Sequence, residues 1–467
     1  MLATFILAVM SIYWGVLSHV ELNIPSLGVY VVDFDGQVGP YTTREEPLVG
    51  PLVLKTVEQL MASTPQHLGY TTLSPSDFNN DPMLVREAVY QHHAWAAIIV
   101  NPNATALLRT AVSQGNASYD PLGACQVVFV EARDQTTYPE YIFPEINQLQ
   151  TEIISSFGTM WTKMVMQNTS IPRSNLGTAP QALSPAIGFS SFNLRPFKPA
   201  ATIPTVNIGL IYLIIVAFFS FPFFMPIHIT FMVPSGHPPL RFWQTIVWRW
   251  VSAVSVYFFL SLAYSLVSLA FQIPFNNPTA PHTEVAQNPN AYGRGTFPVY
   301  WMINFVGMIA LGLACENVAM AVGQPWTALW LIFWVISNVS TGFYAIELAP
   351  RFYAWGYAWP LHNSKSCISI FVIEQMCRIS PERMADHYAY GSRRSNPQHP
   401  LRSALPYRAE LRRPFRLVCD QYCTVSLLLL SDALEDAEAE AQVARRKVTR
   451  ARRYVTWVMS RKFSFFD

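Results

Sequence analysis

The sequence predicts a membrane protein with an N-terminal transmembrane anchor, an exo-facing α/β domain and a C-terminal all-α transmembrane bundle. Only 13% of the 467 residues are charged, whereas soluble domains carry about 25%. Several uncharged hydrophobic runs are long enough to span a membrane, and strand-like and helix-like segments alternate between the first two runs. The net charge of +2 is too small to indicate nucleic acid as a partner.

The first hydrophobic run covers residues 2–20 and carries no formal charge. A hydrocarbon core of about 30 Å needs about 20 apolar residues, so this run predicts an uncleaved anchor over residues 1–20. A cleavable signal peptide is the alternative, but a basic n-region and an A-x-A-like cleavage site are missing. Acidic residues directly after the run favour an amino terminus on the inside.

Four further hydrophobic runs predict a transmembrane helical bundle over residues 206–375. Tryptophan and tyrosine flank these runs, as they do at membrane interfaces. We expect the first run to end just before Pro226, since proline interrupts helices. The predicted spans are residues 208–224, 251–271, 297–322 and 326–343, followed by an interfacial segment over residues 355–375.

Residues 21–205 are expected to form one extracellular or luminal α/β domain, because strand-like and helix-like segments alternate there. The predicted strands are residues 27–36, 96–100 and 124–134, with an edge strand near residues 67–73. The predicted helices are residues 51–61, 82–93, 104–114 and 138–167. Asn103 is expected to cap the third of these helices.

N-glycosylation motifs begin at Asn103, Asn116 and Asn168, all between the first two predicted spans. Such motifs are modified on the luminal side, so we expect a glycoprotein of the secretory pathway, in the plasma membrane or the endoplasmic reticulum. A further motif at Asn338 lies inside a predicted span and cannot be modified there. Cys125 is the one cysteine of the α/β domain, which excludes a disulfide within it.

Three residues within the third predicted span of the bundle are candidates for translocation or coupling. Glu316 is the one acidic residue inside a well-defined span, and an intramembrane carboxylate is costly enough to indicate proton coupling or a cationic substrate. A hydrogen bond to a neighbouring helix near the membrane face is the alternative. Asn304 and Asn317 are further candidates, although helix–helix hydrogen bonds are the commoner role of such residues.

The charged residues and histidines of the α/β domain are expected to have structural rather than catalytic or metal-binding roles. Asp33 and Asp35 could bind a cation, but such residues more often mark a strand end, with Gly36 in the turn. The charged residues of 131–134 are expected to form a solvated cluster. The histidines at 92–93 are expected at a helix end, because adjacent helical residues point in different directions and do not form a metal pair.

No catalytic constellation stands out in the sequence. No local motif indicates a Ser-His-Asp or Cys-His arrangement, and no P-loop motif is present. The cysteines of CDQYC lack two further ligands at zinc spacing. We therefore expect no enzyme, no cofactor and no metal. Membrane lipids and small toxic compounds are the expected partners, and homo-oligomerisation stays open.

Several sequence pieces occur together and in order over roughly residues 10–375. They include SIYWG, VYVVDFDG, WAAIIVNPNATALL, VFVEARD and RFYAWGYAWPLHN. These pieces resemble the fungal nitrosoguanidine-resistance family of multi-pass membrane proteins. The resemblance implies a membrane-anchored exo-domain followed by a helical bundle similar to the membrane domains of ABC exporters, without an ATPase.

The resemblance also implies resistance to nitrosoguanidine and other toxic compounds. Export of small molecules is the leading hypothesis. The alternative is a non-transporting membrane regulator or scaffold that affects lipid organisation through its exo-domain. Glu316 distinguishes the two hypotheses in principle: a position on a polar path would favour transport, whereas a position at a helix contact would favour the scaffold.

The chain departs from the family pattern in its polar, atypical tail, residues 376–467. Family members continue into a final membrane helix, but here an Arg- and Pro-containing stretch follows. The basic residues near 445–453 favour an inside location, whereas five spans from an inside start place the tail outside. Both a native tail and an artefact of mis-splicing stay open.

Overall fold

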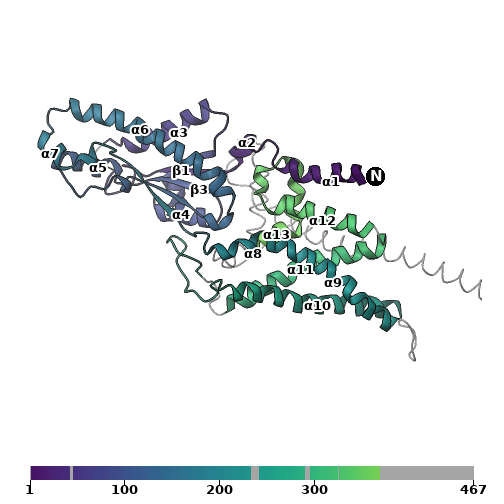
Figure 1. Cartoon of the computed structure of the whole chain (residues 1–467). Helices are drawn as coiled ribbons and strands as arrows, with labels where there is room; N and C mark the ends of the chain where they lie inside the picture. Colours follow the sequence, from purple (N-terminus) through teal and green to yellow (C-terminus); the bar gives the residue numbers. More distant parts are fainter. Residues whose placement is uncertain (1, 43–45, 233–240, 290–294, 324–325, 369–467) are drawn as a thin grey trace, which may run out of the picture. The chain divides into compact units, whose positions relative to one another are not determined.

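A computed structural model describes residues 2–42, 46–232, 241–289, 295–323 and 326–368 (Figure 1). The described residues belong to two compact units. The first contains residues 2–313 and 331–368, and the second contains Ala314–Trp330. The tail at 376–467 and the end of the predicted interfacial segment lie outside the described residues.

The chain begins with helix α1 (Leu2–Val16), followed by α2 (Val20–Asn23) and a 3-10 turn, η1 (Ile24–Ser26). The chain bends by 47° between α1 and α2–η1, where His19 has a left-handed φ of 60°. A helix of 15 residues is only about 22 Å long, so α1 can count as a span only together with the bent segment. The anchor over residues 1–20 therefore stays a prediction.

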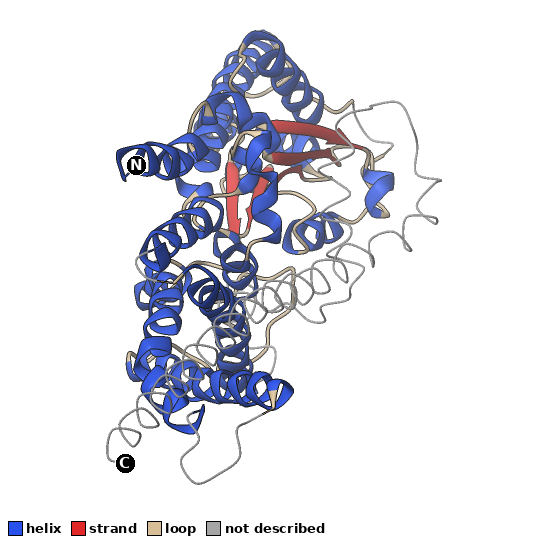
Figure 2. Ribbon diagram, turned by 90° about the vertical axis from the view of Figure 1, so that its right-hand side faces the viewer, coloured by secondary structure: helices blue, strands red, loops and turns tan. Residues whose placement is uncertain are grey.

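A five-stranded sheet with the order β2-β1-β3-β4-β5 forms the centre of the α/β domain. Figure 2 shows its strands among the helices. The neighbours β1/β2, β1/β3 and β4/β5 are parallel, and β3/β4 is antiparallel. The strands are β1 (Gly28–Asp33), β2 (Gly69–Leu73), β3 (Ala96–Val100), β4 (Cys125–Phe129) and β5 (Phe189–Asn193).

Helices cover both faces of the sheet, which explains why all five residues of β3 are buried. Val29 and Val31 point to one face because successive strand residues alternate, and they share a core with α3 (Val49–Ser63), α5 (Ala104–Gln114) and α6 (Phe143–Gln167). Helix α4 packs on the other face (Figure 1). It begins at Pro82 and ends at Tyr90.

Shorter elements join the strands and helices of this domain, and the last of them, η7 and α8, lead to α9 (Ile208–Met232). They are the 3-10 turns η2 (Pro75–Phe78), η3 (Pro121–Gly123), η4 (Glu131–Arg133), η6 (Pro180–Ala182) and η7 (Ala200–Thr202), the π-helical turn η5 (Tyr138–Ile142), and helices α7 (Arg173–Thr178) and α8 (Ile203–Val206).

The predicted strands and helices of the domain are confirmed, with shorter strands than expected. The predicted strand 27–36 ends at Asp33, and the predicted strand 124–134 ends at Phe129. The fifth strand, β5, was missed because its sequence FSSFN lacks a β-branched apolar run. The capping prediction was wrong: Asn103 stands at the start of α5, but its side chain makes no capping hydrogen bond.

Four long apolar helices follow the α/β domain in the described part of the chain. They are α9 (Ile208–Met232), α10 (Phe242–Ala270), α11 (Thr296–Val322) and α12 (Trp326–Gly342). Among the described residues, α9, α10 and α11 are long and apolar enough to cross a membrane by themselves, and the bent N-terminal pair would add a fourth span. The prediction of five spans is therefore only partly confirmed, because α12 has 17 residues.

The prediction that the first helix of the bundle ends just before Pro226 was wrong. Helix α9 continues through Pro222 and Pro226 to Met232. Proline removes one helical hydrogen bond, but neighbouring groups can satisfy the freed carbonyls in a membrane helix.

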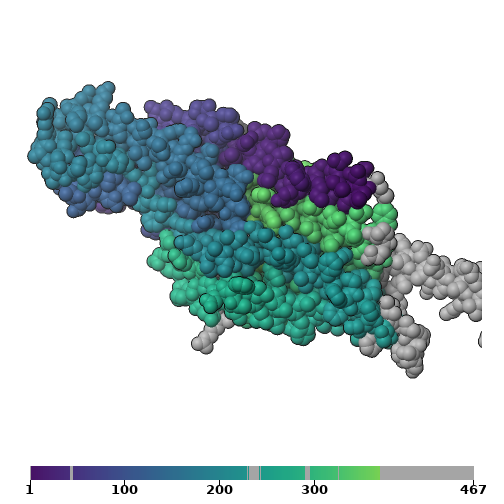
Figure 3. Space-filling model, viewed as in Figure 1, coloured from purple at the N-terminus to yellow at the C-terminus, as the bar shows by residue number. Residues whose placement is uncertain are grey.

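The segment after α12 folds back on that helix. It contains η9 (Ile346–Leu348), η10 (Arg351–Ala358) and α13 (Pro360–Ile368). Tyr353 in η10 donates a hydrogen bond from its hydroxyl to the carbonyl of Ile12 in α1 (2.7 Å), so the N-terminal helix lies against this segment (Figure 3). Gly15 leaves room for the Tyr353 hydroxyl, since a Cβ at Gly15 would lie 2.4 Å from it.

A buried carboxylate joins the starts of α3 and α5 at the carboxyl ends of β1 and β3. Asp35 is 1% exposed and accepts hydrogen bonds from the backbone N–H of Thr105 (2.9 Å) and of Gly50 (3.3 Å). The Thr105 hydroxyl donates to the same carboxylate and accepts from the N–H of Leu48 (2.9 Å) and of Val49 (3.1 Å). One side-chain pair thus satisfies the free N–H groups of two helix starts.

Asp33 lies beside this network at the end of β1. Its carboxylate accepts from the N–H of Asp35 (2.9 Å) and from Gln37 Nε2 (3.2 Å). It also packs against Gly50, where a Cβ would lie 2.0 Å from Asp33 Oδ1. Burial disfavours the charged form of Asp33, whereas the two hydrogen bonds favour it. The effect of burial is larger, and the pKa of Asp33 is raised to about 6. The interpretation of both aspartates as strand-end residues agrees with this geometry.

We expect Asp33→Asn to stabilise the protein at pH 7. A raised native pKa means that the native state binds more protons than the unfolded state between about pH 4 and pH 6, so stability falls as the pH rises through this window. The shift from 3.8 to about 6 corresponds to up to about 3 kcal/mol. The thermal midpoint of Asp33→Asn should exceed that of the wild type at pH 7 and converge with it toward pH 4.

Asp35→Asn is the matched control. An amide cannot accept all the hydrogen bonds that the Asp35 carboxylate accepts, so this variant should lose about 1–3 kcal/mol near neutral pH. Equal destabilisation of the two variants at pH 7 would contradict the assignment of a strained, buried charge to Asp33.

Candidate functional site

Asn304, a predicted translocation residue, lies in a polar seam between α10 and α11. It is fully buried, and its Nδ2 donates to Ser265 Oγ at 3.0 Å. One turn away, Ser268 Oγ and the Tyr300 hydroxyl form a hydrogen bond of 2.9 Å. These bonds join two apolar helices, so Asn304 serves a helix–helix contact in this structure.

Asn338 has a similar role between α12 and α13. Its Nδ2 donates to the carbonyl of Trp334 (2.9 Å), and its Oδ1 accepts from the N–H of Leu361 (3.2 Å) at the start of α13. The side chain is fully buried, which agrees with the expectation that this motif is not glycosylated.

Glu316 and Asn317 lie on the part of α11 that belongs to the second compact unit. Glu316 is 8% exposed, and both residues take part in interactions. The role of Glu316 and Asn317 in coupling stays a prediction.

A buried ion pair connects the α/β domain to α13. Lys365 Nζ lies 2.8 Å from Asp134 Oδ2 and also donates to the carbonyl of Phe343 (3.1 Å). Asp134 Oδ1 accepts from Thr136 N (3.0 Å), Thr136 Oγ1 (2.7 Å) and Thr137 N (3.1 Å). Burial alone would raise the pKa of the Asp134 carboxyl, but the Lys365 ammonium and these hydrogen bonds hold that pKa below its usual range.

The prediction of a solvated charge cluster at residues 131–134 was wrong. Besides the buried Asp134, the Arg133 guanidinium stacks 3.7 Å from the centre of the Trp95 ring. Glu131 Oε2 accepts from Asn193 Nδ2 at 2.7 Å. A local sequence window shows several charges together but not the distant groups that bury and pair each of them. The histidines at 92–93 do lie just beyond the end of α4, as expected.

The long loop between α10 and α11 is held against the α/β domain by two arginines. Arg86 in α4 donates to the carbonyl of Thr283 (3.3 Å). Arg195, which is fully buried, donates to the carbonyls of Pro281 (3.0 Å) and Glu284 (2.8 Å). Because Arg keeps its charge even when buried, these contacts fix the loop by charge-assisted hydrogen bonds to its backbone.

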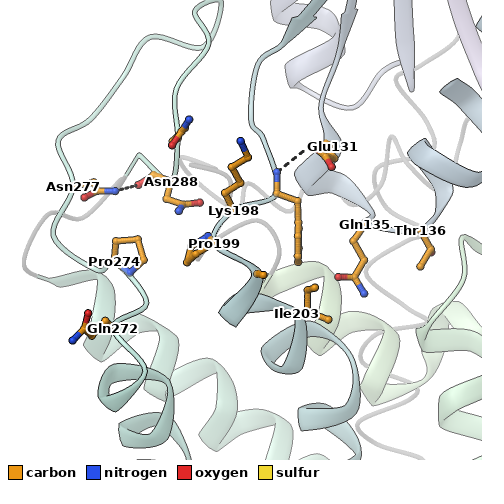
Figure 4. Close-up of a pocket in the computed structure, with 13 residues that line it drawn as sticks. Glu131, Gln135, Thr136, Lys198, Pro199, Ile203, Gln272, Pro274, Asn277 and Asn288 are labelled. Atoms are coloured by element: carbon orange, nitrogen blue, oxygen red, sulfur yellow. Dashed lines mark hydrogen bonds between the residues drawn. The ribbon is translucent and has the colours of Figure 1, made fainter. Parts of the chain in front are cut away.

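A pocket of about 950 Å³ is lined by this loop, by the α/β domain and by the segment that leads to α9 (Figure 4). Its wall comes from residues 131–136 after β4, residues 197–203 that lead toward α9, and residues 272–288 that follow α10. Its volume is at the upper end of the roughly 300–1,000 Å³ that is typical of small-molecule sites. The pocket therefore has the size and the position for a ligand at the junction of the α/β domain and the membrane helices.

The pocket wall combines apolar surface with polar side chains that have no hydrogen-bond partner among the described residues. Phe197, Pro199 and Ile203 supply apolar surface. The polar groups without a side-chain partner in this part of the chain are Gln135, Lys198, Gln272 and Gln287. Such a mixed wall suits an amphiphilic ligand, because apolar surface supplies affinity and a few polar groups fix its orientation.

Asn288 marks a polar position that the protein itself leaves unsatisfied. Its backbone has a φ of 43°, a conformation that asparagine tolerates better than most residues, and its carbonyl accepts from Asn277 Nδ2 at 3.0 Å. The residue is only 5% exposed, yet its Oδ1 has no hydrogen-bond partner in the described structure. A buried acceptor left in this way costs about 1–3 kcal/mol, so the position favours a donor supplied by a ligand.

Sequence reasoning missed this pocket, although one signal was available. The connection between α10 and α11 spans residues 271–295, and loops longer than about 12–15 residues are uncommon unless they are functional or disordered. Its asparagines and glutamines carry no recognisable motif, however. Their convergence with Glu131 and Lys198 depends on tertiary contacts.

The three candidate glycosylation sites differ in their surroundings. Asn116 and Asn168 are exposed, and the Oδ1 of each accepts a hydrogen bond from the backbone two residues later. Asn103 is only half-exposed. The Thr105 hydroxyl of its motif is buried against Asp35. The fold is thus compatible with modification at Asn116 and Asn168 and unfavourable at Asn103.

The fold and the site define the class of protein. The chain is a membrane protein that combines apolar membrane-spanning helices with an α/β sheet domain. Residues 1–375 match the family described as "Protein of unknown function (DUF3533)", and the chain belongs to this family.

A relative in Saccharomyces cerevisiae is the uncharacterized endoplasmic reticulum membrane protein YJR015W. The two are 27% identical over 287 residues, which cover 60% of this chain and 52% of the relative. The chain thus spans about half the length of this curated relative. No solved structure matches the chain.

We expect Lys365→Met to be strongly destabilising, because it leaves the Asp134 carboxylate buried without a counter-charge. Loss of one partner of a buried pair costs about 3–5 kcal/mol. The thermal midpoint of the purified full-length protein should fall, and Asp134→Asn combined with Lys365→Met should restore part of the loss. Additive losses in the double variant would show that the two charges are not coupled.

We expect Asn116→Gln and Asn168→Gln each to remove one glycan, whereas Asn103→Gln should leave the glycan number unchanged. The measurement is gel mobility with and without endoglycosidase. Loss of a glycan in Asn103→Gln would contradict the inference from the buried Thr105. Absence of any glycan on the wild type would contradict the predicted luminal or extracellular location of the domain.

Proposed function

We propose that this membrane protein binds small amphiphilic molecules in the pocket between its α/β domain and its membrane helices, and that it confers resistance to toxic compounds such as nitrosoguanidine by exporting them. The pocket carries the proposal, since its volume of about 950 Å³ and its mixed wall suit compounds of this kind. The resemblance to the nitrosoguanidine-resistance family supplies the compound class. The proposed activity is binding and transport rather than catalysis, at a membrane of the secretory pathway.

The alternative function is that of a non-transporting regulator or scaffold that affects lipid organisation through the α/β domain. The hydrogen bonds of Asn304 favour it, because this side chain contacts Ser265 on a neighbouring helix and does not line the pocket. The ion pair between Asp134 and Lys365 also favours it. Asp134 bonds to Thr136 in the pocket wall, so a change at the pocket on ligand binding would be transmitted to α13.

The two functions differ in the accumulation of a labelled nitrosoguanidine-type compound in cells with and without the protein. Under the export proposal, accumulation is lower with the protein, and this effect is lost on collapse of the proton gradient or in Glu316→Gln. Ala200→Trp, which fills the pocket wall, should abolish the effect. Ala62→Trp is the matched control, because Ala62 is exposed on α3 away from the pocket.

Unchanged accumulation in cells that carry verified amounts of the protein would reject export of that compound and support the regulator. An effect that survives in Ala200→Trp but not in Glu316→Gln would keep export and reject the pocket as its binding site.

A further inference from the structure

We propose that the resident ligand of the pocket is a zwitterionic phospholipid from the adjoining leaflet, with its headgroup in the pocket and one acyl chain along the exposed face of α9. This inference rests on the proposed function only in using the same pocket. It names the membrane itself as the source of the ligand.

The charges of the pocket fit a zwitterion. Glu131 and Lys198 both line it, and no ion pair joins them in the described part of the chain. The Glu131 Oε2 atom is occupied by Asn193 Nδ2 and by the N–H of Phe197 (3.3 Å), which leaves Oε1 for a ligand. An ammonium near Glu131 and a phosphate near Lys198 would pair both charges, whereas a purely anionic ligand would leave the carboxylate beside a like charge.

The uncharged polar groups fit the remaining parts of such a headgroup. The amides of Gln135, Gln272 and Gln287 can donate to phosphate and ester oxygens. The buried Asn288 Oδ1 atom, which lacks a partner, directs partial negative charge into the pocket wall.

The surroundings of the pocket supply a path for an acyl chain. Ile203, which is 43% exposed, lies in the pocket wall at the start of α8, directly before the membrane helix α9. The exposed apolar residues of α9 recur every three or four positions, which places them on one helical face. They are Ile208, Tyr212, Val216, Phe219, Phe223 and Ile227.

The opposite face of α9 is buried in the bundle through Leu210, Leu213, Ile214 and Ala217. The exposed stripe therefore faces the bilayer, where the acyl chain of a bound lipid can stay in an apolar environment while its headgroup occupies the pocket. A soluble ligand of the same charge would gain nothing from this stripe. The exposed stripe of α9 follows directly after Ile203 of the pocket wall, and this position is the reason to choose a lipid as the occupant.

The test measures binding of phospholipids with a fluorescent acyl chain to the delipidated full-length protein in detergent. We expect saturable binding of a phosphatidylcholine probe and at least tenfold weaker binding of a phosphatidylglycerol probe, which lacks the ammonium. Lys198→Gln should weaken phosphatidylcholine binding by about tenfold, as expected for one lost charge-assisted contact. Lys163→Gln, an exposed lysine of α6, should bind as the wild type does.

A second variant separates loss of binding from loss of folding. Ile203→Asn is an exposed substitution that removes the link to the stripe, so the lipid should bind more weakly while the thermal midpoint stays within a few degrees of the wild type. Equal binding of the two probes, or unchanged binding in both Lys198→Gln and Ile203→Asn, would overturn the proposal. Soluble phosphocholine that binds as tightly as the lipid would overturn it as well, because the acyl chain would then contribute nothing.

The outcome is independent of the test of export. Accumulation of the toxic compound measures transport in cells, whereas the lipid titration measures occupancy of the pocket in the purified protein. Export without selective lipid binding would reject this inference and leave the proposed function intact, and the reverse result would reject export and leave the lipid site.

Discussion

The buried ion pair between Asp134 and Lys365 is the interaction on which the arrangement of the α/β domain and α13 depends. The two residues are 231 positions apart in the sequence, and their side chains meet at 2.8 Å. Burial of either charge alone would carry a desolvation cost of several kcal/mol. The Asp134 carboxylate and the Lys365 ammonium are therefore buried together. Asp134 also accepts from Thr136, a residue of the pocket wall. The shape of the pocket is therefore tied to the same pair.

Two regions of the structure are suited to a ligand, and the protein's own side chains fill one of them. In sheets of this kind, ligands usually bind outside the carboxyl ends of parallel strands, where helix starts present free N–H groups. Here Asp35 and Thr105 occupy that position between β1 and β3 and satisfy the starts of α3 and α5. The polar groups that remain available lie instead at the junction with the membrane helices, where Asn288 and Lys198 line the pocket.

Polar residues of α10 and α11 form a set of contacts between these two helices. Ser265, Asn304, Ser268 and Tyr300 pair across α10 and α11, as small and polar residues do where apolar helices associate in lipid. These contacts hold α10 and α11 together at the positions of Asn304 and Tyr300.

The sequence by itself determined the membrane class, the alternation of strands and helices, and most element positions, because hydropathy and periodicity are local properties. It identified α5 after AAIIV and the turn NPN, but not what satisfies the helix start. That role belongs to Asp35, 70 positions from Thr105. Only the tertiary structure decided that Asp134 is buried, that Asn304 bonds to Ser265, and that Glu131, Lys198 and Asn288 share one pocket. Each of these features depends on contacts between residues that are far apart in the chain. A local sequence pattern does not show which distant residues will bury or pair with one another.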